Sequence, residues 1–237
     1  FYSCTLPRNQ VPLTAPTVTD NCAFTLSNDA PATFPLGATT VTWTAKDASG
    51  NTSTKTQSVT VKDAIPPELY APPDLALVTD LNSCARAGSN VDLGLPVASD
   101  NCSSPVVTND KPASFPIGIT DVIWTATDGS GNTATATQRV TIFDATPPVI
   151  LAPADIAVDA DAGMCYWTVD AEDLGQPINL TDNCALGLTA TNSAGSTLNV
   201  GTHRIIWTAT DAQGNRSTDV QVVTVTGDPP TITDNPD

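Results

Sequence analysis

The feature that most constrains the fold of this chain is a nine-residue motif that occurs three times. It reads Trp-Thr-Ala-x-Asp-x-x-Gly-Asn and begins at Trp43, Trp124 and Trp207, so the tryptophans are 81 and 83 residues apart. A fixed period of this length indicates one structural unit used three times. The 237 residues therefore divide into three domains of about 80 residues each, a size that can fold independently.

The motif sets the expected boundaries of the repeats. We expect them at residues 1–63, 64–144 and 145–226. Cys4 stands where Cys84 stands in the second repeat, so the first strand of the first repeat is expected to be missing. Residues 227–237 begin like a further repeat, which makes them either its opening strand or a donor strand.

The strand pattern is clearest around the second tryptophan. Val122, Trp124 and Ala126 fall on one face, and Ile123, Thr125 and Thr127 fall on the other, as in a half-buried strand. The chain shows no trustworthy helical periodicity, and its short strands, regular turns and many Thr and Val residues predict an all-β sandwich. We expect Trp43, Trp124 and Trp207 to anchor the three cores.

Two prolines interrupt the first strand of the second repeat. Pro72 and Pro73 lie inside the stretch 69–78. Because proline cannot donate a hydrogen bond to a neighbouring strand, this strand should lie at a sheet edge or change sheets at that point.

The six cysteines form three sequence pairs of nearly constant spacing. The pairs Cys4/Cys22, Cys84/Cys102 and Cys165/Cys184 are separated by 18, 18 and 19 residues. One pair per repeat predicts one disulfide in each domain rather than zinc ligands, because zinc sites favour closely spaced cysteines with histidine partners and the chain has one histidine. Stable disulfides indicate an oxidising environment outside the cytosol.

The charge balance narrows the range of partners. Nine Lys and Arg residues face 25 Asp and Glu residues, a net charge of −16. Such a surface repels phosphate, which argues against nucleic acid and anionic membranes as partners. This negative charge is compatible with binding of divalent cations. The alternative interpretation is that it only keeps the protein soluble. No apolar run approaches the ~20 residues that a membrane-spanning helix needs, so we expect no membrane insertion.

Several motifs together resemble the hyalin repeat. They are Asp-Asn-Cys at 20–22, 100–102 and 182–184, Phe-Pro-x-Gly, the tryptophan motif itself, and a Val-x-Asp-x-x-Pro-Pro exit. The resemblance covers essentially the whole chain. It implies three tandem immunoglobulin-like sandwiches arranged as a rod, secreted or at the cell surface, serving adhesion or acting as spacers. It implies no catalytic residues.

Acidic residues at the repeat ends make calcium binding one interpretation of the sequence. In an immunoglobulin-like sandwich, two loops share the end that receives the linker from the preceding domain, and together they could offer the six to eight oxygens that Ca²⁺ takes. The alternative is turn chemistry, since Asp and Asn side chains bind backbone N–H groups in tight turns. The candidate ligands are Asp63, Asp100, Asp128 and Asn132 at the first junction, and Asp144, Asp182, Asp211 and Asn215 at the second.

The sequence gives no support for an enzyme. His203 lies on the strand that leads to Trp207 and has no counterpart in the other repeats. The chain contains neither a Gly-x-Ser-x-Gly motif nor a phosphate-binding glycine loop.

These observations favour a non-enzymatic extracellular structural protein, a subunit of a surface filament or adhesive stalk. Donation of the strand around Thr231, Ile232 and Thr233 to another copy would produce a head-to-tail homopolymer. The other reading of the ends is a segment of a longer repeat array. The alternative function is an adhesion module that binds a carbohydrate or a receptor, with Tyr166 and Trp167 as its aromatic contacts.

Overall fold

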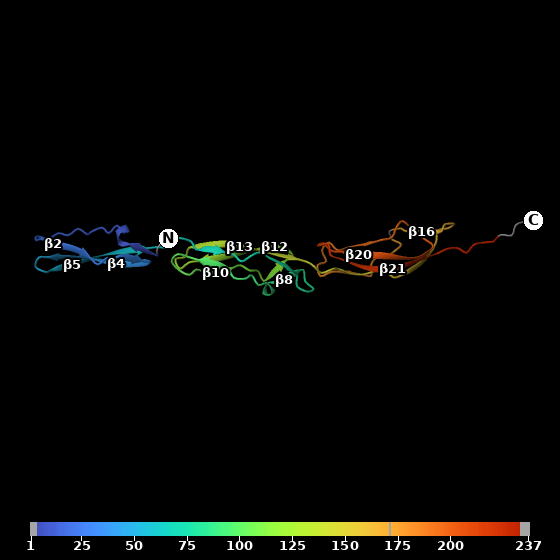
Figure 1. Ribbon diagram of the computed structural model, residues 1–237, viewed down its shortest axis with the longest axis horizontal. Coiled ribbons are helices and arrows are strands. Elements are labelled where there is room, and N and C mark those ends of the chain that lie inside the picture. Colours follow the sequence, from blue (N-terminus) through green and yellow to red (C-terminus); the bar gives the residue numbers. More distant parts are fainter. Residues whose placement is uncertain (1–3, 171, 233–237) are drawn as a thin grey trace, which may run out of the picture. The chain divides into compact units, whose positions relative to one another are not determined.

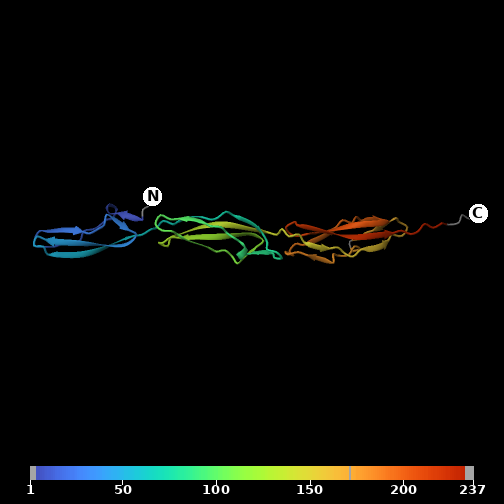
Figure 2. The same cartoon turned by 60° about the horizontal axis from the view of Figure 1, so that its bottom comes forward.

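Strands joined by loops make up nearly all of the described structure. The computed structural model describes residues 4–170 and 172–232 (Figure 1). Within these residues the helical elements are two short 3-10 turns, η1 (Arg8–Gln10) and η2 (Gly88–Asn90). No described helix is long and apolar enough to cross a membrane. The predicted all-β class is confirmed, and Figure 2 shows the same strands from a second side.

The strands follow the same order in the three repeats. The first repeat contains β1 (Thr5–Pro7), β2 (Phe24–Asn28), β3 (Thr33–Pro35), β4 (Gly37–Asp47) and β5 (Thr52–Val61). The second contains β6 (Glu68–Tyr70), β7 (Leu75–Val78), β8 (Ala85–Ala87), β9 (Val97–Ser99), β10 (Val106–Asn109), β11 (Ser114–Pro116), β12 (Gly118–Thr127) and β13 (Thr133–Phe143). The third contains β14 (Val149–Leu151), β15 (Ile156–Asp159), β16 (Tyr166–Thr168), β17 (Asn179–Thr181), β18 (Thr189–Asn192), β19 (Thr197–Asn199), β20 (Gly201–Thr210) and β21 (Arg216–Thr226).

Contacts divide the chain into two compact units, both of which include part of the second repeat. The first unit comprises residues 1–74, 93–111 and 121–139, and the second comprises 75–92, 112–120 and 140–237. In the first unit, β2, β4 and β5 form an antiparallel sheet, β1 pairs with β3, and β6 pairs with β9.

The third repeat, which lies wholly in the second unit, shows the sandwich most completely. One sheet has the order β15-β21-β20-β18, and the pairs β14-β17 and β16-β19 supply strands for the other face. Ile150 of β14 and Leu198 of β19 share one buried cluster with Trp207 of β20 and Val223 of β21. The core therefore lies between the two layers, as the sandwich prediction requires.

Alternating burial along the long strands explains why the tryptophans lie inside. On β12, Val122, Trp124 and Ala126 are at most 5% exposed, whereas Ile123 between them is 36% exposed. Trp43 and Trp207 occupy the same positions on β4 and β20 and are 8% and 4% exposed. The two-residue period of a strand thus points all three indoles into their cores.

The proline pair in the second repeat does change the sheet to which the chain belongs. Before Pro72, β6 pairs antiparallel with β9. After Pro73, β7 pairs in parallel with β13 and takes the edge of the sheet β10-β12-β13-β7. The predicted sheet switch is confirmed.

The first repeat has a smaller sheet than the other two. Its sheet β2-β4-β5 has three strands, whereas the corresponding sheets of the second and third repeats each have a fourth strand, β7 or β15, parallel to β13 or β21. Among the described residues, no strand lies beside β5 on that side.

The cysteines pair differently from the prediction. The disulfides are Cys4–Cys102 and Cys84–Cys184, with Cα–Cα distances of 5.1 and 4.9 Å. The expected pairings Cys4–Cys22, Cys84–Cys102 and Cys165–Cys184 are wrong, and Cys22 and Cys165 are free and exposed. Each bridge joins the first cysteine of one repeat to the second cysteine of the next. Shifting the partner by one repeat preserves the period, so spacing alone could not distinguish the two patterns.

Candidate functional site at the repeat junctions

The aspartate of the tryptophan motif closes a tight turn. Asp128 Oδ1 accepts hydrogen bonds from the backbone N–H groups of Ser130 and Asn132, both at 2.8 Å. Its Oδ2 accepts the side-chain amide of Asn132 at 2.7 Å. Asp47 and Asp211 accept the same three bonds in their own repeats, at 2.7–2.9 Å. The motif is therefore a side-chain-locked turn in every repeat.

These hydrogen bonds favour the ionised carboxylate. Burial raises the pKa of Asp128 and of Asp211, but the Asn132 and Asn215 side chains and the backbone amides of the turn outweigh it. Both pKa values lie below the ordinary value of 3.8. The turn carboxylates are therefore negative charges at neutral pH.

The turn asparagines also reach the chain that enters from the preceding repeat. The Asn132 side-chain amide donates to the carbonyl oxygens of Asp63 and Ile65, at 3.3 and 3.4 Å. The Asn215 amide donates to the carbonyl oxygen of Asp144 at 3.1 Å. The two asparagines thus connect each turn to its incoming linker.

The linker aspartates and the Asp-Asn-Cys loops use one carboxylate oxygen each for local turns. Asp63 Oδ1 accepts the N–H of Ile65 at 3.1 Å, and Asp144 Oδ1 accepts that of Thr146 at 2.9 Å. In the loops, one carboxylate oxygen of Asp100 and one of Asp182 accept the N–H of the cysteine two residues later, at 2.9 and 2.7 Å. Turn chemistry therefore accounts for one oxygen of each carboxylate.

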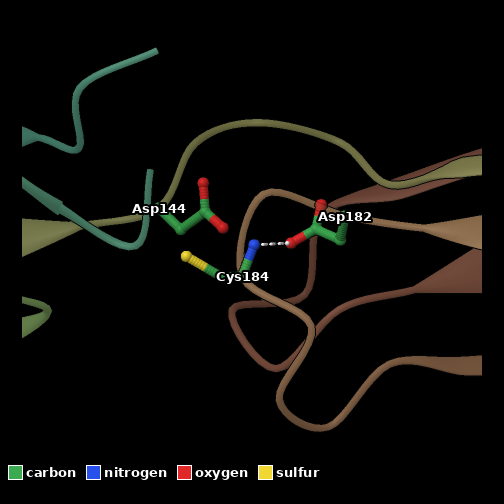
Figure 3. A group of neighbouring side chains, drawn as sticks. All are labelled: Asp144, Asp182 and Cys184. Carbon is green, nitrogen blue, oxygen red and sulfur yellow. Dashed lines mark hydrogen bonds between the residues drawn. The ribbon is translucent and has the colours of Figure 1, made fainter. Parts of the chain in front are cut away.

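Carboxylate oxygens of the linker and of the loops lie close together at both junctions. One carboxylate oxygen each from Asp63, Asp100 and Asp128 lies within 4.8 Å of the others. At the next junction, oxygens of Asp144 and Asp182 lie within the same distance of each other and of the Cys184 sulfur. Figure 3 shows the Asp144 carboxylate directed toward the loop that carries Asp182 and Cys184. Each junction thus gathers negative oxygens from a linker and a loop.

The other expected ligands lie in different positions. Asp211 is not part of the cluster around Asp144, and it is fully engaged by the turn of its own motif. Asn132 and Asn215 present their amide N–H groups, rather than an oxygen, to the linker. Of the eight residues expected from the sequence, five lie in the two clusters.

A disulfide and an amide hydrogen bond accompany the second cluster. Cys184 directly follows Asp182 and Asn183 and is bonded to Cys84. The Asn183 side-chain amide donates to the carbonyl oxygen of Ser83 at 3.1 Å and to Asp144 Oδ1 at 3.2 Å. One loop thereby binds both the linker aspartate and the neighbour of the bridged cysteine.

A comparison with known protein families identifies the chain. The model of the HYR domain matches residues 4–61 and 62–142. The chain belongs to the HYR family. The predicted resemblance to hyalin repeats is confirmed, and the matched ranges are two successive HYR repeats of the kind described above.

Relatives of this HYR protein agree with the assignment. Hyalin of Lytechinus variegatus is 30% identical over 92% of this chain and 43% of its own length. Hyalin of Strongylocentrotus purpuratus is 32% identical over 84% of this chain and 17% of its own length. A mouse protein with sushi, von Willebrand factor type A, EGF and pentraxin domains is 31% identical over 74% of this chain and 5% of its own length. The chain thus spans less than half the length of these relatives.

Among solved structures, the first four cadherin domains of Drosophila N-cadherin share 13% identity with this chain, over 83% of it and 60% of the cadherin chain. The TM-score is 0.39, too low to add to the fold described above. The family itself places this chain outside the cell, as an extracellular module of the adhesion type.

Sequence reasoning missed a buried glutamine in the second and third repeats. Gln138 and Gln221 are 0% exposed and accept the indole N–H of Trp124 and Trp207, each at 3.1 Å. The Gln221 amide donates to two backbone carbonyls, at 2.9 and 3.2 Å. The constant spacing of 14 residues between tryptophan and glutamine, which also holds for Gln57, is the signal that would have found them.

The aromatic pair of the third repeat is not an exposed binding patch. Tyr166 and Trp167 lie on β16 and are half-buried, and Trp167 packs against the core of that repeat. His203, on β20, has its Nε2 atom 2.6 Å from the carbonyl oxygen of Asn199. These side chains have structural contacts, which weakens the alternative of an aromatic ligand site.

Proposed function

We propose that this chain is a non-enzymatic structural protein outside the cell, a subunit of a surface filament or adhesive stalk whose copies join head to tail by strand donation. The observation that carries the proposal is a hollow in the first repeat that corresponds to the place of a strand in the other two. The chain also carries a segment of matching sequence.

The hollow lies beside the core tryptophan of the first repeat. It has a volume of about 450 Å³ and is lined by residues 16–19 and by parts of β2, β4 and β5, including Trp43. Residues 17–19 immediately precede an Asp-Asn-Cys loop, as β9 and β17 do in the later repeats. In the described structure residues 17–19 form no strand.

The later repeats indicate what would fill this hollow. There, β6 pairs with β9 and β14 pairs with β17, and both short strands directly follow a Pro-Pro pair. The central residue of β14, Ile150, is 9% exposed and belongs to the core of its repeat. A strand of this kind therefore closes one side of the sandwich.

The matching segment is Pro229-Pro230-Thr231-Ile232, which repeats the sequence pattern Pro-Pro-x-Leu/Ile that begins β6 and β14. Ile232 is 97% exposed. By the register of β14 with β17, Ile232 of one copy would lie opposite Val18 of another and cover Trp43. Thr231 is exposed, and Thr233, the third residue of the expected donor strand, lies outside the described residues.

The free cysteines support the same direction of assembly. Inside the chain, the first cysteine of a repeat is bonded to the second cysteine of the following repeat. By that rule Cys165 of a donor copy would meet Cys22 of the acceptor copy, and both are exposed. One interface would then combine the donated strand with a third bridge of the same kind.

Negative-stain microscopy and non-reducing gels of the oxidised chain test the proposal. We expect head-to-tail fibres, a ladder of covalent oligomers and a Cys22–Cys165 peptide in the mass spectrum. The variant Ile232→Asp places a charge in the donated strand, so we expect monomers. Leu81→Asp is the matched control, because Leu81 is likewise highly exposed, at 86%, and should leave the fibres intact.

Two results would overturn strand donation. One is a wild-type chain that remains monomeric at high concentration in oxidising buffer. The other is fibres that persist unchanged in Ile232→Asp, which would mean that another surface joins the copies. A ladder that is lost in Cys165→Ser while the fibres remain supports donation, with the bridge as an additional lock.

A further inference from the structure

We propose that each junction between successive repeats binds one Ca²⁺ ion, held by the linker aspartate and the Asp-Asn-Cys loop. The observation is a set of buried oxygens without hydrogen-bond partners. In the described part of the chain, six buried side-chain N or O atoms lack a partner, and five of them are oxygens of the two junctions. The sixth is Ser217 Oγ, on β21.

The second junction is the more deeply buried. Asp144 is 5% exposed, and its Oδ2 has no hydrogen-bond partner. Asp182 Oδ1 and Asn183 Oδ1 are also buried and unpartnered. Figure 3 shows the Asp144 and Asp182 carboxylates on facing segments, the linker and the loop. Two carboxylates therefore lie close together with an unpartnered oxygen each, and the loop that holds Asp182 carries a third unpartnered oxygen, that of the Asn183 amide.

The first junction repeats the arrangement with equivalent residues. Asp63 Oδ2 and Asp100 Oδ1 are buried and unpartnered. Asp128 brings a third carboxylate oxygen within 4.8 Å of these two residues' carboxylates. The pairing of a linker aspartate with a loop aspartate, each with one unpartnered oxygen, thus recurs at both junctions.

Buried like charges this close need a counter-charge. Lone carboxylates are strongly disfavoured away from water unless they are paired or bind a metal. The ion pair between Arg139 and Asp121 lies outside both clusters. A metal cation therefore satisfies the oxygens that turn chemistry leaves unpartnered.

The donor atoms select the ion. They are hard carboxylate and amide oxygens, which suit Ca²⁺, whereas zinc prefers thiolate and imidazole. The nearby sulfur of Cys184 is already bonded to Cys84, so it is not a thiolate. Calcium also accepts six to eight ligands in irregular geometry, with carbonyl groups and water completing the set, whereas magnesium demands a strict octahedron.

Calorimetric titration of the 237-residue chain with CaCl₂ tests the proposal, and the same titration of the Ile232→Asp variant tests it without assembly. We expect two sites, with dissociation constants of about 10⁻⁴ to 10⁻³ M as in other extracellular modules, and weaker binding of MgCl₂. Asp144→Asn and Asp63→Asn should each remove one site. Asp20→Asn is the matched control, because Asp20 makes the same loop turn, accepting the Cys22 N–H at 3.0 Å, in a repeat without a described linker aspartate.

Thermal unfolding separates a calcium ligand from a merely structural residue. In calcium, Asp144→Asn should lower the unfolding midpoint by at least about 4 °C, because it forfeits ligand stabilisation. In EDTA the same variant should be as stable as wild type or more so, because it removes like-charge repulsion. Absence of calcium binding, an equal midpoint in calcium and EDTA, or loss of a site in Asp20→Asn would overturn the proposal.

Discussion

The first and third repeats share their tryptophan turn but differ in how completely they are enclosed. The core of the third repeat is a cluster of nine buried residues, whereas the buried cluster of the first repeat consists of Ala30, Phe34 and Val41. The third repeat has β14 and β15, and no strand corresponding to either occurs in the described first repeat. One short segment of chain at the start of a repeat thus determines how much of its core is buried.

The turn, in contrast, does not depend on that segment. The carboxylates of Asp47 and Asp211 accept the same three hydrogen bonds at nearly the same distances. The turn is therefore set by local hydrogen bonds, whereas the core requires a strand from the start of the repeat.

The largest expected difference between the two repeats concerns the buried glutamine. Gln221→Ala leaves an indole N–H and two backbone carbonyls buried without partners, so we expect a loss of roughly 4 kcal/mol in the unfolding free energy of the third repeat. Gln57→Ala, at a half-buried site, should cost the first repeat roughly 1 kcal/mol. Native-state hydrogen exchange of the β20 and β4 amides measures both. Equal losses would contradict the comparison.

A smaller difference between the two repeats is expected for the valines at the sheet edge where the third repeat has β15 and the described first repeat has no strand. Val223 is 0% exposed and pairs with Ile156 of β15, so Val223→Ala should cost about 2 kcal/mol. Its counterpart Val59 on β5 is only half-buried, and Val59→Ala should cost about 1 kcal/mol. Urea unfolding followed by hydrogen exchange provides the values. If copies assemble as proposed above, Val59→Ala should lower the unfolding free energy of the first repeat by more in fibres than in the free chain.

The turn glycines should show no difference at all. Gly50 and Gly214 have φ values of +95° and +88°, and a Cβ added at either would meet nothing within 4 Å. Replacement by alanine therefore adds only backbone strain, about 1 kcal/mol in each repeat. Exchange rates of amides in the two turns, with wild type as reference, test this equality. A markedly larger cost in the third repeat would show that the turn depends on its core.

The smallest effect on stability is expected when the pH is lowered. Because the folded-state pKa of Asp211 is depressed, its contribution to stability is complete above the unfolded value near 3.8 and is lost as the pH falls below it. The same sign holds for Asp47, whose pKa is lowered mainly by the Asn51 side chain. Asp211→Asn should therefore flatten the stability profile of the third repeat between pH 4 and pH 2 without changing its direction above pH 5, as thermal scans across pH would show.

Local chemistry made much of the fold predictable. Alternation around Trp124 gives the buried face of β12, and the missing N–H groups of Pro72 and Pro73 give the sheet switch. The four aspartates Asp63, Asp100, Asp144 and Asp182 could be nominated from the sequence because they stand at repeat ends. Which of their oxygens lack a hydrogen-bond partner depends on how the folded chain brings these residues together. No sequence pattern predicts this.

The disulfides mark the limit of that reasoning. A periodic sequence specifies which cysteines are equivalent but not how far along the array each one finds its partner. Only the proximity of the Asp-Asn-Cys loop to the preceding repeat, seen in Cys84–Cys184, decides between the alternatives.

The bridges Cys4–Cys102 and Cys84–Cys184 have a consequence for protease resistance. Their covalent loops overlap, because Cys84 precedes Cys102 along the chain. A single backbone cut anywhere between residues 4 and 184 therefore leaves both fragments attached through at least one bridge. Bridges confined to single repeats would let one cut between them sever the molecule. An extracellular protein built this way can be nicked and still remain one covalent strand.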